Sequence, residues 1–175
     1  MKKLFTFFIL TSTLLLSCSS NESDITFITN NDIIGNWRLV DFKIEGITKG
    51  IYKNSNVNGK VISHGKNYNF YFNFNDDHQL YLNGDFTTIT TSTSNGVSKT
   101  IKSKTKIING FYNKANWLID DKNLKLISTD GYVFNIVIEE FYTHKMILKL
   151  AIEKKQTIKN IDFTTSGTQY IILER

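Results

Sequence analysis

Four aromatic side chains alternate along residues 67–75, and this alternation constrains the fold more than any other feature of the chain. The rings belong to Tyr68, Phe70, Phe72 and Phe74, and mostly asparagines separate them. Successive side chains of a β-strand point to opposite faces, so the four rings would share one dry face. A helix cannot place them on one side. The segment therefore predicts a half-buried strand.

The same period of two recurs along the rest of the chain, between clusters of turn-forming residues. Asp76-Asp77-His78 predicts the turn of a hairpin over residues 67–83, and Gly84-Asp85 and Asn95-Gly96 are expected to interrupt the segment that follows. Proline is absent, so no predicted strand lacks a hydrogen-bond donor. Further sets that share a face are Phe111, Ala115, Trp117 and Ile119; Leu124 and Leu126; Tyr132, Phe134, Ile136 and Ile138; and Met146, Leu148, Leu150 and Ile152.

These patterns predict an all-β protein with about eight to nine antiparallel strands. Tight turns between consecutive strands favour an up-and-down meander. Closing the meander into a barrel removes its unpaired edges, which would otherwise invite pairing with other chains. A β-sandwich is the alternative that the patterns leave open.

The beginning of the chain carries a different signal. Lys2-Lys3, an apolar run over residues 4–16 and the tetrad Leu15-Leu16-Ser17-Cys18 resemble a bacterial lipoprotein signal peptide with its lipobox. The run is shorter than the roughly 20 apolar residues that a membrane-spanning helix needs. The resemblance implies a diacylglyceryl group on the thiol of Cys18, cleavage before it, and acylation of the new amino terminus, for example with palmitate. It also implies a cell-envelope protein anchored to the outer membrane, on its periplasmic or its surface face.

We expect three segments: a signal peptide (1–17), a lipidated cysteine with a flexible tether (18–31), and one folded domain (32–175). The tether is polar and has no period; Glu22 and Asp24 within it bear either on sorting or only on solvation. Loss of Lys2 and Lys3 lowers the formal charge from +5 to +3, which weakens a nucleic-acid interpretation. Cys18 is the only cysteine, so the domain must fold without a disulfide.

Gly35-Asn36-Trp37 opens the first strand predicted after the tether. With Phe72–Asp77 and Trp117–Leu126 following in order, residues 33–175 resemble the small lipocalin-like domains of bacterial lipoproteins. The Gly-x-Trp signature of that family implies a barrel whose floor holds the indole of Trp37. It also implies an arginine from the last strands stacked on that indole, and Arg175 is the only late arginine. Thr129-Asp130 before Tyr132 is similar to a second lipocalin signature, with Gly131 inserted.

The sequence predicts no enzyme, no cofactor and no metal site. His64, His78 and His144 are scattered without the spacing of a helical zinc pair. Asp76-Asp77-His78 is explained by a solvated turn better than by a cation site. Glu139 and Glu140 would point to opposite faces of a strand, so they cannot act as an acid–base pair.

Two functions remain, and they differ in what fills the barrel. In the first, the barrel binds a small hydrophobic or amphipathic ligand, which Trp37, Tyr68, Phe70, Phe72, Phe74, Phe111 and Trp117 would line. In the second, the same side chains fill the lumen, and a non-enzymatic structural or interaction module meets an envelope partner through its outer surface. The family resemblance supports the first function. The second is favoured because an aromatic stripe with a period of two more often forms a packed core than lines a pocket.

One surface feature stands out. Lys102, Lys104 and Lys106 alternate along a predicted strand, with Lys99 near them. Such a ladder usually protects a solvated strand from edge pairing. The other interpretation is contact with an anionic envelope surface, where each lysine adds about 1 kcal/mol to membrane attraction.

Overall fold

The computed structural model describes residues 27–52, 55–106, 114–158 and 161–175, and these residues form an almost entirely β structure. The all-β prediction is therefore confirmed. One short helix precedes nine strands: α1 (Asn30–Ile33), β1 (Gly35–Tyr52), β2 (Ser55–Phe74), β3 (Gln79–Ser94), β4 (Val97–Thr105), β5 (Lys114–Asp120), β6 (Asn123–Ser128), β7 (Val133–Tyr142), β8 (Lys145–Ile158) and β9 (Ile161–Glu174).

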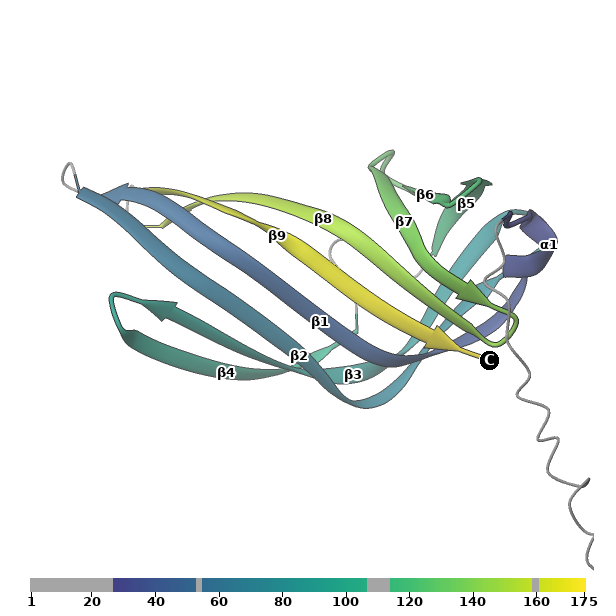
Figure 1. Cartoon of the computed structure of the whole chain (residues 1–175), viewed down its shortest axis with the longest axis horizontal. Coiled ribbons are helices and arrows are strands. Elements are labelled where there is room, and N and C mark those ends of the chain that lie inside the picture. Colours follow the sequence, from purple (N-terminus) through teal and green to yellow (C-terminus); the bar gives the residue numbers. More distant parts are fainter. Residues whose placement is uncertain (1–26, 53–54, 107–113, 159–160) are drawn as a thin grey trace, which may run out of the picture.

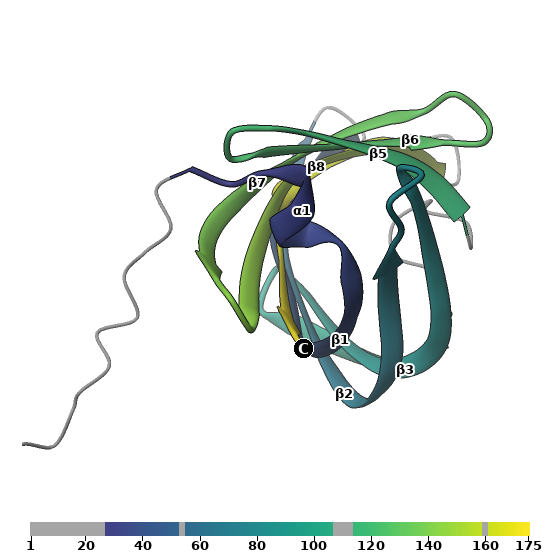
Figure 2. The ribbon, with the colours of Figure 1, turned by 90° about the vertical axis from the view of Figure 1, so that its right-hand side faces the viewer.

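All nine strands belong to one antiparallel sheet in the order β2-β1-β9-β8-β7-β6-β5-β3-β4. A further pairing between β2 and β3 closes eight of them into a ring (Figure 2). The meander is interrupted once, because β5 pairs with the beginning of β3 rather than with β4. β4 instead extends the sheet outside the ring as a partner of the far half of β3.

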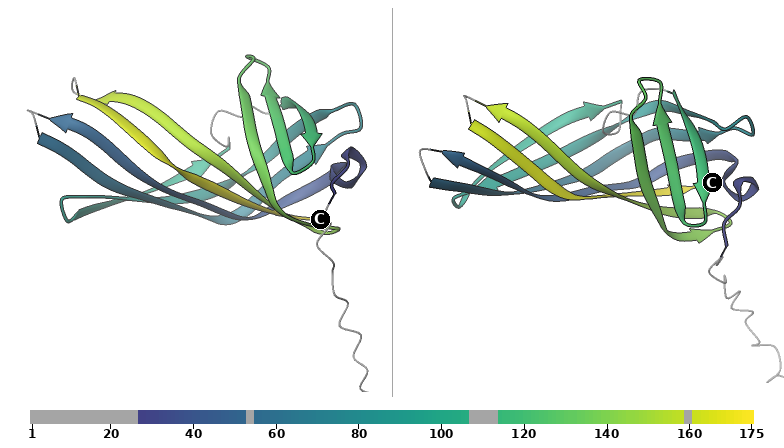
Figure 3. Two further views of the ribbon diagram at one scale, coloured as in Figure 1. Left: turned by 45° about the horizontal axis from the view of Figure 1, so that its top comes forward. Right: turned by 90° about the horizontal axis from the view of Figure 1, so that it is seen from above.

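The strands differ greatly in length, and this difference divides the molecule into two regions. β1 has 18 residues and β2 has 20, whereas β5 has 7 and β6 has 6. β7 pairs with β8 only as far as Lys149, and the short strands β5 and β6 end near there as well. The other six strands, β1–β4, β8 and β9, continue beyond this point as an open, curved sheet (Figures 1 and 3). We call this sheet the arm (residues 43–52, 55–66, 86–106, 150–158 and 161–169), and we call the other described residues the ring end.

The hydrophobic core lies inside the ring end, where the inward residues of the strands meet. Its largest fully buried side chains include Trp37, Trp117, Phe70 and Phe74, and Phe86, at the beginning of the arm, packs against them. α1 covers one end of the ring and adds Ile28 and Ile33 to the core (Figure 2). The folded part of the chain thus begins at least four residues before the expected boundary at residue 32.

Two expectations about strand boundaries are wrong. Gly84-Asp85 does not interrupt the chain, because Gly84 adopts a φ of +102° inside β3 and a register shift on β2 between Lys66 and Asn69 lies opposite it. Tyr132 does not share the buried face of Ile136 and Ile138. It belongs to the turn formed by Gly131 and is 67% exposed.

The inner face of the arm continues the inward face of the ring and mixes small and hydroxyl-bearing residues with apolar ones such as Ile44, Ile152 and Phe163. Gly46 pairs directly with Gly167, and a Cβ on Gly167 would lie 2.7 Å from the Cα of Gly46 and still closer to the carbonyl oxygen of Glu45. Hydroxyl groups on neighbouring strands bond to each other across this face. The pairs are Thr48–Thr165 at 2.8 Å, Ser63–Thr90 at 2.7 Å and Thr88–Ser103 at 2.8 Å.

Candidate functional site

The residues predicted to line a ligand site lie together inside the ring end. Trp37 is 0% exposed, and Phe70, Phe72, Phe74 and Trp117 are at most 2% exposed. Tyr68 is partly buried and packs against this cluster. Phe111 and the lipidation site Cys18 lie outside the described residues. The six described side chains of this set, Trp37, Tyr68, Phe70, Phe72, Phe74 and Trp117, thus face inward.

These aromatic rings pack against one another rather than around an opening. Phe74 meets Trp117 edge to face with ring centroids 5.6 Å apart, and Phe70 meets both Phe72 and Phe86 in the same way at 5.6 Å. Offset and edge-to-face contacts at this spacing are the favoured geometry of an aromatic core. This packing can stabilise the closed ring of strands. A ligand could enter only by displacing aromatic side chains that already pack against one another.

Trp37 lies against the helix that covers the end of the ring. Its indole Nε1 donates a hydrogen bond of 2.7 Å to the carbonyl oxygen of Ile33, the last residue of α1. Gly35, two residues earlier, has a φ of +136°, a conformation that L side chains rarely adopt, which explains the glycine at the start of β1. The local sequence Gly35-Asn36-Trp37 therefore fixes the chain direction and the position of the indole together.

The guanidinium of Arg175 lies over the same indole. Its guanidinium carbon lies 4.4 Å from the centroid of the Trp37 ring. Its Nε donates a hydrogen bond of 2.6 Å to the carbonyl oxygen of Thr143, and one Nη donates a hydrogen bond of 3.1 Å to the carbonyl oxygen of Ile34. The late arginine that the family resemblance implies over Trp37 is thus Arg175, and its guanidinium joins the beginning of β1 to the β7–β8 turn.

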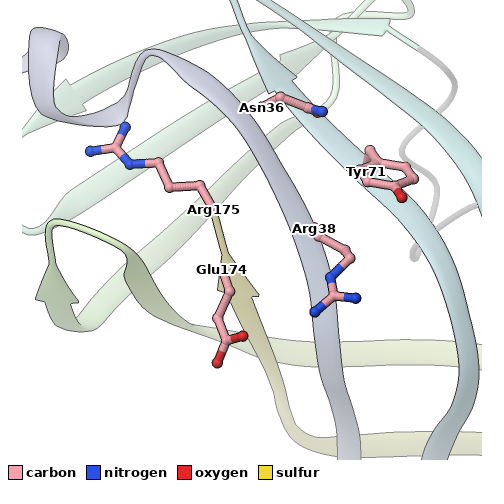
Figure 4. A pocket seen from close by; sticks show the side chains of 5 residues that line it. All are labelled: Asn36, Arg38, Tyr71, Glu174 and Arg175. Carbon is pink, nitrogen blue, oxygen red and sulfur yellow. The ribbon is translucent and has the colours of Figure 1, made fainter.

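A small hollow of about 280 Å³ lies on the outer surface beside Arg175, lined also by Asn36, Arg38, Tyr71 and Glu174 (Figure 4). Arg38 pairs in register with both Tyr71 and Glu174, so these three side chains face outward, away from the core. The Arg175 guanidinium is held by carbonyl oxygens and by Trp37, and serves the fold rather than a ligand.

Tyr68 marks the inner limit of the core, where the ring end meets the arm. Its hydroxyl donates to the Asp41 carboxylate at 3.2 Å and accepts from the backbone N–H of Phe42 at 3.0 Å. Burial, assisted by the negative charge of Asp41, raises the pKa of Tyr68 to about 12. Sequence patterns did not predict this pair, because Asp41 lies beside a register shift of β1 that no local signal reveals.

The polar turn residues play structural roles. The Asp77 carboxylate accepts a 3.0 Å hydrogen bond from the backbone N–H of Gln79, and the His78 ring lies 5.1 Å from that of Trp117. Within the described residues, no three His, Cys, Asp or Glu side chains gather as they would around a metal ion. No helix in that same part of the chain is long and apolar enough to cross a membrane.

α1 and its neighbours were missed by the sequence patterns, which assigned this stretch to the tether. The Asp32 carboxylate accepts hydrogen bonds from the backbone N–H and the hydroxyl of Thr29, at 2.8 and 2.6 Å. A threonine followed three residues later by an acidic residue resembles a capping box. This spacing, together with the apolar residues Ile28 and Ile33 on either side, could have predicted a short helix.

The described part of the lysine ladder lies on one face of β4. Lys102 pairs with Ile89 and Lys104 with Thr87, so both share the outer face. Lys99 pairs with Ser92 and lies on the inner face, because it is three positions before Lys102 and side chains alternate between the faces of a strand. Lys106 is exposed just beyond the strand.

Comparison of the chain with models of protein families, with curated proteins and with solved structures finds no match.

Proposed function

We propose that this protein is a lipid-anchored cell-envelope protein. In this proposal it binds its partners through its outer surface rather than a ligand in an internal site. In this proposal Cys18 carries the lipid and the described residues form a lipocalin-like, non-enzymatic interaction or structural module. The lipobox Leu15-Leu16-Ser17-Cys18 supports the anchor.

The position of the chain termini supports this arrangement. The first described residue, Phe27, leads into α1 at the ring end, opposite the strand tips of the arm (Figure 1). Phe27 is nine positions after Cys18, which sets an upper limit of roughly 30 Å on the distance between the lipid and the body. The ring end is therefore the end that the anchor would hold close to the membrane.

Three features support the lipocalin-like assignment. The Gly35-x-Trp37 sequence begins the first strand, the Arg175 guanidinium stacks 4.4 Å from the Trp37 ring, and eight antiparallel strands close a ring around this pair. The family resemblance predicted the first two from sequence. Their combination with the ring favours a lipocalin-like barrel over a sandwich.

The single observation that favours a filled module over a ligand binder is the packing of the aromatic core. Of the rings proposed for the lumen, those of Trp37, Phe70, Phe72, Phe74 and Trp117 are at most 2% exposed, and Tyr68 lies partly buried at their edge. Ligand pockets bury most of a ligand's surface in space that is already formed. Here the aromatic rings fill the space that a ligand would occupy. This packing supports the recognition of partners through the outer surface.

The anchor is tested by replacing Cys18 with serine and fractionating cells. The unmodified protein is expected in the membrane pellet after a salt wash, and the Cys18→Ser protein in the supernatant. Thr13→Ser, within the same apolar run, is the matched control and should leave the protein in the pellet. A Cys18→Ser protein that still sediments with membranes would refute the lipid anchor.

The filled core is tested separately with the lipid-free chain from Ser19 onward, which keeps every core residue, since the core spans Ile28 to Leu173. Titration with palmitic acid or retinol should leave the fluorescence of Trp37 and Trp117 without saturable change. Saturable quenching at a ratio of one ligand per chain would instead restore the ligand-binding function.

A further inference from the structure

Charge is distributed unevenly between the two regions of the molecule. The arm carries ten lysines, no arginine and three acidic residues, and the ring end carries seven cationic and eleven acidic residues. The lysines of the arm are Lys43, Lys49, Lys60, Lys66, Lys99, Lys102, Lys104, Lys106, Lys154 and Lys155; its acids are Glu45, Glu153 and Asp162. The arm is thus strongly basic, and the end that holds the tether is acidic.

Strand register gathers much of this positive charge on the outer, convex face of the arm. Lys43 on β1 pairs with His64 on β2, which pairs with Ile89 on β3, which in turn pairs with Lys102 on β4. This row crosses four strands, or roughly 15 Å at the usual strand spacing. The next row beside it pairs Lys66 with Thr87 and Thr87 with Lys104. Lys60 lies on the same face, opposite Ile47 and Thr93.

The acidic residues of this surface neutralise only part of its charge. Lys43 forms an ion pair of 2.9 Å with Glu45, and Lys104 forms one of 3.0 Å with Asp85. The Lys43 pair, assisted by the charges of Lys60 and His64, lowers the pKa of Glu45, so this carboxylate stays ionised in neutral solution. Both pairs are solvent-exposed and therefore weak. Among the described residues, no ion pair involves Lys60, Lys66 or Lys102.

We infer that this convex basic face (Lys43, Lys60, His64, Lys66, Lys102 and Lys104) binds the anionic headgroups of a lipid bilayer, so that the arm lies along the membrane surface. The inference rests on the proposed anchor for the identity of that membrane. Lys43 is eight residues from the beginning of β1, or roughly 26 Å along the strand. The tether spans a similar distance, so the lipid on Cys18 can reach the bilayer while the face rests on it.

The chemistry of the face favours a bilayer over a specific anionic ligand. Bidentate recognition of single phosphate or carboxylate groups typically uses arginine, which the arm lacks. Lysine ammonium groups spread over four strands match a diffuse layer of negative charge. The acidic ring end is repelled by the same layer, so the uneven charge also turns the arm toward the membrane.

The test uses the lipid-free chain from Ser19 onward and sedimentation with vesicles. Vesicles of phosphatidylcholine alone are compared with vesicles containing 30 mol% phosphatidylglycerol, a composition that supplies roughly −30 to −50 mV of surface potential. The chain should bind only the anionic vesicles, and raised salt should release it. The triple variant Lys60→Glu, Lys66→Glu and Lys102→Glu should lose about 100-fold in partitioning, at roughly fivefold for each lysine.

The matched control is Lys114→Glu, Lys122→Glu and Lys125→Glu, which changes the net charge equally on exposed lysines of the ring end. This control should keep most of the binding. Equal loss in both variants would overturn the proposal, because net charge alone would then explain it. Absence of vesicle binding, with retention on the carboxylated polysaccharide alginate, would overturn it in favour of a glycan partner. Because no lipid is attached, neither outcome depends on Cys18.

Discussion

The ring end and the arm belong to one continuous sheet, yet different interactions hold them. The ring end buries large side chains, such as Trp37 and Trp117, in a closed core. The arm continues the same strands with glycines and hydroxyl-bearing residues on its inner face, where Thr48 bonds to Thr165 across 2.8 Å. Hydrophobic burial contributes about 25 cal/mol for each Å² removed from water, whereas a hydroxyl hydrogen bond adds about 1 kcal/mol net.

This comparison shows that strand pairing and core formation are separable in one sheet. The arm keeps the backbone hydrogen bonds of its six strands while burying few large side chains. Regions with few buried apolar contacts open locally at a lower free energy than the core. The arm is thus the region whose conformation and charge respond most readily to a partner, and the ring end is the region that fixes the fold.

The largest expected effect comes from truncating the indole of Trp37. Trp37→Ala should lower the free energy of unfolding by about 3–5 kcal/mol, because it removes a fully buried side chain under α1 and Arg175. Equilibrium denaturation of the chain from Ser19 onward measures this loss. Phe163→Ala, which truncates a partly buried ring of the arm, should cost less than about 2 kcal/mol. Equal losses would remove the distinction between the two regions.

The second expected effect concerns the close approach of the arm strands at Gly46 and Gly167. Gly167→Val should destabilise the protein by about 1–3 kcal/mol, because the new side chain would overlap the backbone of Glu45 and Gly46. Hydrogen exchange should show faster exchange in the arm and unchanged protection in the ring end. Ser166→Val, an exposed neighbour on the outer face, is the control and should change stability by less than about 0.5 kcal/mol. Uniform loss of protection in Gly167→Val would show that the regions unfold together.

Sequence patterns predicted the ring end better than the arm, for a physical reason. The alternation of Phe70, Phe72 and Phe74 predicts a strand with one dry face, and the resemblance at Gly35-x-Trp37 implies a late arginine over the indole, which the structure shows to be Arg175. In the arm, threonine, serine and lysine occur on both faces, so the pattern does not distinguish inside from outside. The sequence therefore predicts the alternation of Lys102 and Lys104 but not which face of the sheet they occupy, nor that the nearby Lys99 lies on the other one.

Long-range pairing was the other feature that sequence could not supply. Nothing local indicates that β5 pairs with β3 instead of β4, because the choice depends on the relative lengths of strands far apart in the chain. The same holds for the contact between Tyr68 and Asp41, which a register shift in β1 brings together. The helix over residues 30–33 is different, since its Thr29–Asp32 spacing was visible in the sequence.

A smaller effect tests whether hydroxyl pairs hold the arm together. Thr88 is 9% exposed, and its hydroxyl contacts those of Ser103 at 2.8 Å and Thr105 at 3.0 Å. Thr88→Val keeps the shape and removes these bonds, so it should cost about 1 kcal/mol in equilibrium denaturation. Thr91→Val removes a similar pair with Thr100 on the exposed face and should cost less. A stabilising Thr88→Val would mean that the arm gains more from apolar contact than from its hydroxyl pairs.

The smallest effect is a pH dependence at the boundary between the two regions. Because the pKa of Tyr68 is about 12 in the folded protein and near 10 in an unfolded chain, the folded state holds this proton more tightly. The contribution to stability is complete below pH 10 and declines between pH 10 and pH 12, as the unfolded chain loses the proton first. Tyr68→Phe should remove that decline, so the two free energies of unfolding should converge as the pH rises. Parallel curves, or a Tyr68 that ionises together with exposed Tyr132 in ultraviolet absorbance, would show that water reaches this boundary and that the core ends before it.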